Sequence, residues 1–194
     1  PHTLLGTWVG DSIFRTDYSN RGKNNRYKEV YMEGLKSNDL EEYRFVISRH
    51  LNKTLDNLEN VGYFDLIQKL NIELTYLIHF GFLPSKEDYH GCILFINAVK
   101  THAMNMGEIL KQINNVPSFY RRSMKYISGC KKPKTLIGKW IKNRGLSKEN
   151  IFMEFIHNIL GMAINWTNLS YYYILKHTQG IIPDIPNTKE MRMA

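Results

Sequence analysis

An uninterrupted stretch from Gly145 to Gly180 limits the folds open to this chain more than any other feature. It holds no proline over about thirty residues, enough for roughly 45 Å of α-helix at about 1.5 Å per residue. Ser147 is a favourable N-cap, because its hydroxyl can accept an unpaired amide proton of the first turn. Gly180 is a favourable stop, with Lys176 and His177 in the last turn. The stretch therefore predicts one long helix that crosses a whole domain.

The apolar residues of this stretch recur at helical spacing and form two adjacent stripes. The stripes consist of Ile151, Phe155, Ile159 and Met162, and of Phe152, Ile156, Leu160 and Ala163. A polar interruption follows, made of Asn165, Thr167, Asn168 and Ser170. Burying such side chains without hydrogen-bond partners is unfavourable. The interruption therefore indicates either a wet cavity or ligand at this level, or side chains that face solvent or neighbouring loops.

Apolar residues at helical spacing also occur upstream of the long stretch. They predict helices over residues 40–58, 63–82, 86–110 (as one helix or two), 119–127 and 135–142. Residues 1–27 read as irregular, 27–35 as a short helix, and the proline-containing tail after residue 180 as extended. Neither an alternating strand pattern nor an internal repeat is evident. We therefore expect a mostly α fold, a multi-helix array around one long central helix, with residues 1–194 as a single helical domain or a fragment of a larger one.

The chain is basic, with a net charge of +8 over 194 residues and an isoelectric point near 9.4. Such a charge favours an acidic partner or an anionic surface. Basic residues gather in one stretch beside two tyrosines: Arg121, Arg122, Lys125, Lys131, Lys132 and Lys134, with Tyr120 and Tyr126. This stretch could bind phosphates. No signature of an RNA- or DNA-binding fold accompanies it, so nucleic acid is not an expected partner.

Cysteine usage and hydropathy bear on the cellular compartment. Cys92 and Cys130 give neither a disulfide framework nor a zinc-ligand spacing. No run of roughly eighteen apolar residues occurs, which argues against a transmembrane span. We expect an intracellular, reducing compartment, and the sequence leaves open whether the protein has a membrane anchor elsewhere.

Searches for catalytic motifs are negative. The sequence contains no HExxH, GxSxG, P-loop or GxGxxG pattern. His79, His90 and His102 lie near one another in sequence, but none has metal-ligand spacing with a carboxylate. No metal site is therefore predicted within this chain.

Four motifs in order nevertheless resemble parts of the cytochrome P450 family. The run GKWIKNRGLSKENIFMEFIHNILGMAINWTN is similar to the end of helix H, the following loop and helix I of that family. The segment 174–177 stands where the family has its "LLxHP" element, with Thr178 in place of proline. Residues 45–49 resemble the Trp-x-x-x-Arg motif of helix C, with Phe45 in place of tryptophan. Residues 62–82 resemble helices D and E, so the likeness covers most of residues 40–177.

The resemblance implies a haem cofactor and a set of residues that contact it. Arg49 would pair with a haem propionate, as an arginine fork does well, and Phe45 would lie beside it. Ala163 and Ile164 would line the oxygen-binding groove of helix I, where Asn165 and Thr167 would be the catalytic residues. The family's threonine at the place of Thr167 helps to deliver protons to iron-bound dioxygen.

Departures from the family pattern affect this assignment. Ile164 replaces the usual glycine, Trp166 the usual acid, and Asn168 a second threonine or serine. The family's Cys-containing loop, which supplies the thiolate ligand of the iron, and its ExxR motif are both absent from the sequence. Both normally lie beyond helix I, and the abrupt ends of the sequence agree with an internal piece of a longer protein. The chain alone would then lack the haem-ligand loop and be inactive.

Two functions are consistent with these observations. The first is a fragment of a haem-thiolate monooxygenase that hydroxylates or rearranges an apolar small molecule. It would receive electrons from an acidic donor protein docked on the basic surface. The second is a non-enzymatic helical interaction domain whose binding face is the basic stretch 119–134.

Overall fold

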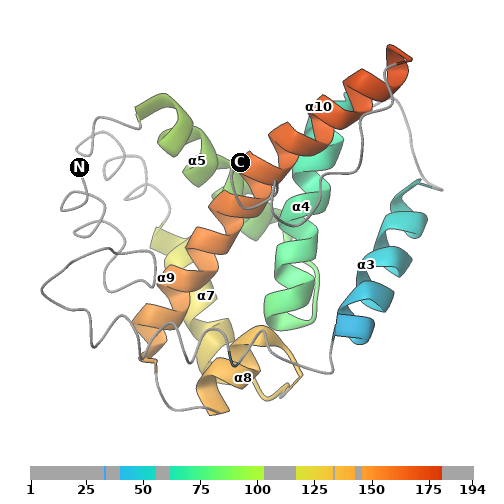
Figure 1. Cartoon of the computed structure of the whole chain (residues 1–194). Coiled ribbons are helices and arrows are strands. Elements are labelled where there is room, and N and C mark those ends of the chain that lie inside the picture. The colour runs from blue at the N-terminus through green and yellow to red at the C-terminus, as the bar shows by residue number, and fades with distance from the viewer. Residues whose placement is uncertain are drawn as a thin grey trace, which may run out of the picture.

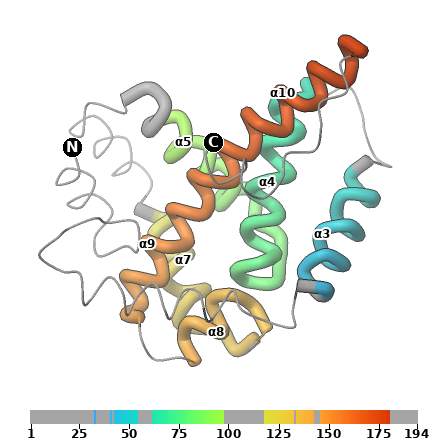
Figure 2. Tube along the Cα trace, in the orientation of Figure 1, coloured from blue at the N-terminus to red at the C-terminus, as the bar shows by residue number. Residues whose placement is uncertain are grey.

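The computed structural model describes residues 33, 40–55, 62–102, 117–132, 134–142 and 146–180, and most of these residues are helical, without any strand among them. The mostly α fold class is thus confirmed for this part of the chain. The helices are α3 (Leu40–Leu55), α4 (Tyr63–Phe80), α5 (Lys86–His102), α7 (Pro117–Gly129), α8 (Leu136–Lys142), α9 (Lys148–Leu160), the π-helix η2 (Gly161–Trp166) and α10 (Thr167–Thr178). Figure 1 shows their arrangement, and Figure 2 traces α9, η2 and α10 as one continuous rod.

The signals at the two ends of the long rod are confirmed. The Ser147 hydroxyl accepts the backbone N–H of Asn150 at 3.1 Å, as an N-cap does. Gly180 has a φ of 73°, a left-handed conformation that favours glycine after a helix. The π turn in the middle was not predicted. It falls immediately before and across the polar interruption, where the helix widens and changes its hydrogen-bond pattern.

Helix α4 is the central element, because it contacts α3, α8, α9, η2 and α10. In Figure 1 it lies between α3 and the long rod. The two sides of α4 carry different partners. Asn71 bonds the rod, whereas Glu73 bonds α3. Residues that are two apart in the sequence of an α-helix are rotated by about 200° from each other around its axis. The contacts of Asn71 and Glu73 are therefore on opposite faces of α4.

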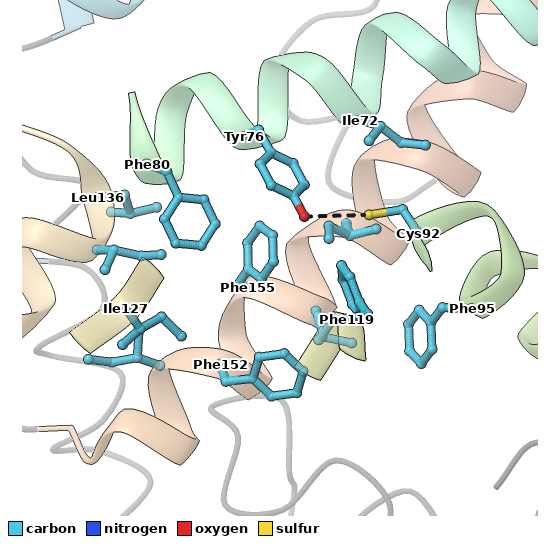
Figure 3. Close-up of a cluster of buried hydrophobic side chains, with 14 of the residues drawn as sticks. Ile72, Tyr76, Phe80, Cys92, Phe95, Phe119, Ile127, Leu136, Phe152 and Phe155 are labelled. Atoms are coloured by element: carbon cyan, nitrogen blue, oxygen red, sulfur yellow. Dashed lines mark hydrogen bonds between the residues drawn. The ribbon is translucent and has the colours of Figure 1, made fainter. Parts of the chain in front are cut away.

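Aromatic side chains fill the interface between α4 and the rod (Figure 3). The Phe155 ring of α9 lies edge-on to Tyr76 and Phe80, with ring centroids 5.3 and 4.8 Å apart. Such tilted arrangements are preferred over face-to-face stacking. Both predicted stripes of the rod are buried or half-buried, which confirms that these faces form the core.

A buried carboxylate ties α5 to α7. Asp88 is fully buried and receives hydrogen bonds from Arg122 Nε at 2.6 Å and from the Tyr126 hydroxyl at 2.9 Å. Ser85 caps the start of α5, since its hydroxyl donates to Asp88 and accepts the Asp88 backbone N–H. With its oxygens satisfied in this way, the buried charge is compatible with a stable core.

The loop between α7 and α8 is held in a fixed shape by Thr135. Its hydroxyl donates to the Lys132 carbonyl at 2.8 Å and accepts the Gly138 backbone N–H at 3.2 Å. Thr135 is therefore the N-cap of α8. Gly138 packs directly against the Lys132 carbonyl, where a side chain would have no room. These contacts place the lysines of the loop.

Some sequence predictions fall outside the described residues. They are the irregular segment 1–27, the helix at 27–35 apart from residue 33, the ends of the helices predicted to reach residues 58 and 110, and the extended tail after Gly180. Among the helices that are described, none is both long enough and apolar enough to cross a membrane.

Gly138→Ala should lower the free energy of unfolding by about 2–4 kcal/mol, because its methyl group would collide with the Lys132 carbonyl. Gly161→Ala is the matched control. A Cβ at Gly161 would meet nothing within 4 Å, and its φ and ψ of −57° and −51° are helical. That substitution should raise stability by about 0.5–1 kcal/mol. Chemical denaturation measures both effects. Equal effects of the two substitutions would contradict the packing of the α7–α8 loop.

Candidate functional site

Thr167 and Ala163, two of the residues predicted to line a haem groove, face α4. Both are fully buried. Asn71 Nδ2 of α4 donates to the Thr167 hydroxyl at 3.0 Å, and Gln68 Nε2 donates to the Ala163 carbonyl at 3.3 Å. The Thr167 N–H donates to the Ile164 carbonyl. It therefore leaves the Ala163 carbonyl for a side chain of α4. Around Thr167, the polar groups of the rod are thus hydrogen-bonded to a neighbouring helix.

The other two predicted residues of the rod lie differently. Ile164 is half-buried against the hydrophobic core, and Asn165 is exposed. Asn168 is also exposed. For these two asparagines the structure agrees with the second interpretation of the polar interruption, in which polar side chains face solvent.

Phe45 and Arg49 lie on α3, away from the rod. The Phe45 side chain is 65% exposed, and Arg49 is exposed as well. Their helix packs on the face of α4 opposite to the one that bonds Thr167. The six predicted site residues are thus not brought together, since α4 separates the pair on α3 from the four on the rod (Figure 1).

These positions do not fit a haem. A porphyrin between Arg49 and Thr167 would have to replace α4, whose Gln68 and Asn71 bond the rod directly. The Cys92 thiol is fully buried in the aromatic core. Its Sγ lies 4.0 Å from the Tyr76 hydroxyl (Figure 3), and burial raises the pKa of the thiol to about 12.

A pocket of about 510 Å³ lies on the other side of α4. Helix α3 contributes Tyr43 and Val46, and the last turns of α4 contribute Leu77, Ile78 and Gly81. The α7–α8 loop completes the lining with Lys131, Lys132, Lys134 and Thr135. The walls are mostly apolar, and the three lysines are exposed. The volume is within the range of about 300–1,000 Å³ that is typical of ligand sites.

The three lysines of the pocket differ in their contacts. Lys132 Nζ donates to the Gly81 carbonyl at 2.9 Å and lies 6.0 Å from the centre of the Phe82 ring. It thereby neutralises part of the negative end of α4. No carboxylate among the described residues forms an ion pair with Lys131. In the pocket, the Lys132 ammonium group is thus hydrogen-bonded within the protein, whereas the Lys131 ammonium group can bind a ligand.

Polar contacts fasten α3 at both ends of the pocket. The Tyr43 hydroxyl donates to the Lys134 carbonyl at 3.2 Å and accepts from Lys139 Nζ at 3.4 Å. About two helical turns further along α3, His50 Nε2 lies 2.8 Å from Glu73 Oε2. Val46 is between these fastenings in the sequence. This arrangement keeps α3 in place while an apolar recess remains beneath it.

A buried histidine belongs to the interface between α4 and the rod. His79 Nδ1 donates to the Thr75 carbonyl at 2.7 Å, and its Nε2 accepts from Asn158 Nδ2 at 2.9 Å. Burial lowers the pKa of His79 to about 4, and the hydrogen bond to Thr75 opposes this shift only in part. The ring is therefore neutral at pH 7 and has a structural role in this interface.

Comparison with protein-family models, with curated proteins and with solved structures gives no match for this sequence. The cytochrome P450 resemblance therefore stays a prediction. Within the described ranges, no group of three or more His, Cys, Asp or Glu side chains is placed to hold a metal ion. The functional argument depends on the pocket.

Sequence reasoning identified only part of this pocket. The basic stretch contains its three lysines, and it was considered as a binding face. The apolar walls were assigned to ordinary helical core, because nothing in the spacing of Val46, Leu77 or Ile78 distinguishes a recess from a packed interface. A useful signal would have been Gly81, whose φ of 75° ends α4 beside the lysine loop.

The stability of the fold should fall between pH 7 and pH 5 because of His79. Its folded pKa of about 4 is below the ordinary value of 6.5, so the unfolded state binds the proton first as the pH falls. The His79 contribution to the free energy of unfolding should drop by about 2 kcal/mol over this range. His157, whose pKa burial also lowers to about 4, adds a contribution of the same sign. His79→Gln should therefore make the profile less steep without flattening it, which urea denaturation at several pH values would measure. An unchanged slope in the variant would contradict the buried neutral ring.

Proposed function

We propose that this chain is a non-enzymatic helical interaction domain that binds an acidic partner protein at the basic pocket. The observation that carries this proposal is the position of the lysine loop. Lys131, Lys132 and Lys134 border an apolar recess between α3 and α4, and the domain has a net charge of +8. A positive rim around an apolar centre is suited to association with a negatively charged surface.

The scaffold supports this role, because it fixes the loop. Thr135 caps α8 through the Lys132 carbonyl, and Gly138 packs on the same carbonyl. Tyr43 bonds the Lys134 carbonyl from α3. A binding loop that is already ordered loses little conformational entropy on association.

The monooxygenase interpretation has less support from the geometry. Its predicted haem contacts lie on both sides of α4, and two of the four on the rod, Ala163 and Thr167, accept hydrogen bonds from that helix. Haem, an apolar small-molecule substrate and an electron-donor protein stay predictions of the family resemblance. The basic surface that was expected to dock an acidic electron donor is the surface that we assign to an acidic partner in general.

The proposal predicts that an acidic peptide binds in a salt-dependent manner through Lys131. A suitable probe is a fluorescent nine-residue peptide with three glutamates on each side of three central glycines. Lys131→Glu should weaken its binding about tenfold in low salt, because an attractive contact becomes repulsive. Fluorescence anisotropy measures the affinity. Raising the salt from 50 to 300 mM should weaken binding by the unmodified protein as well.

Lys176→Glu is the matched control, because it makes the same change of charge on α10, outside the pocket. It should reduce affinity much less than Lys131→Glu. Equal losses in the two variants would indicate a diffuse effect of net charge and would contradict a site at the pocket. Absence of binding by the unmodified protein at 50 mM salt would contradict the proposed function itself.

A further inference from the structure

The pocket has a floor and a rim of different chemistry. Val46, Leu77 and Ile78 carry no polar side-chain atom and form the apolar part of the lining. The charged groups come from the lysine loop at one side. A carboxylate placed on the floor would lose its hydration without gaining a donor, which is unfavourable. An apolar group belongs on the floor, and carboxylates belong at the rim.

The pocket is short along its walls. Helix α3 lines it from Tyr43 to Val46 and α4 from Leu77 to Gly81, which is about one helical turn of each, or roughly 5–6 Å. This length is too small to seat a whole amphipathic helix along the walls. A volume of about 510 Å³ nevertheless exceeds what one small aliphatic side chain fills. It has room for a bulky side chain and part of the segment that carries it, as at the central anchors of many interfaces.

Resting on the proposed function, we infer that the partner is recognised through a short acidic segment that inserts one bulky apolar side chain, aromatic or branched, into this pocket. Carboxylates before and after the anchor meet the lysine rim, with Lys131 as the first ammonium group available to them. Lys132 instead stabilises the contact between the loop and α4, because its ammonium group donates a hydrogen bond to the Gly81 carbonyl at the end of α4. The net charge of +8 favours a segment with several carboxylates over a fatty acid, which has only one.

Two peptides of equal charge test this inference. One is the nine-residue acidic peptide with a central glycine, and the other has tryptophan at that position. The anchored peptide should bind at least tenfold more tightly, as measured by anisotropy at 150 mM salt. Val46→Trp, which narrows the recess, should reduce this advantage. The melting temperature of the variant shows whether it folds.

Photo-crosslinking provides a measurement that does not depend on a pocket variant. A benzophenone side chain at the anchor position should label residues 43–46 and 77–81 of the unmodified protein, as mapped by mass spectrometry. Labelling elsewhere would overturn the inference. A competition experiment with decanoate tests the alternative ligand. If decanoate displaces the anchored peptide, and if its own binding does not depend on the lysines, the pocket binds small amphiphiles. This result would overturn the acidic-segment proposal.

The outcomes separate the two proposals. Equal affinity of the anchored and unanchored peptides, both weakened by Lys131→Glu, would leave an acidic-partner site and overturn only the anchor. Failure of both peptides to bind would overturn both. A tenfold advantage of the anchored peptide that Lys131→Glu does not reduce would contradict the role of the lysine rim.

Discussion

The direct contact between α4 and the long rod is the constraint on which the rest of the structure depends. The rod contains a π turn at Gly161–Trp166, and polar side chains of α4 form hydrogen bonds with the rod at and beside this turn. Asn71 bonds Thr167, and Gln68 bonds the Ala163 carbonyl. Closer to the end of α4, His79 bonds Asn158. Around these polar contacts the rings of Phe155, Tyr76 and Phe80 exclude water, which strengthens hydrogen bonds in the interior.

Because one face of α4 is used in this way, only its other face remains for a site. Helix α3 covers that face incompletely and is fastened by Tyr43 at one end and His50 at the other. The α7–α8 loop closes the recess with lysines, and the shape of this loop follows from Thr135 and Gly138. The core interface thus determines which face of α4 lines the pocket, and local capping determines where the lysines of the α7–α8 loop lie.

Local features were predictable from the sequence, whereas the pairing of distant segments was not. Ser147 and Gly180 mark the ends of the rod because caps depend on a few neighbouring residues. The polar interruption at 165–170 was visible, but its partner Asn71 lies 96 residues from Thr167. A pattern within one helix cannot say whether a ligand, solvent or another helix satisfies such groups. The pocket could not be predicted from the sequence for the same reason, because Val46, Leu77 and Lys131 come from three separate segments.

A double-mutant cycle between Asn71 and Thr167 tests the central contact most directly. The free energies of unfolding of Asn71→Ala, Thr167→Val and the double variant would be measured by urea denaturation. A direct buried hydrogen bond at 3.0 Å predicts a coupling energy of about 1 kcal/mol between the two sites. Additive effects within about 0.3 kcal/mol would show that the two side chains do not interact, and would contradict the placement of α4 against the rod.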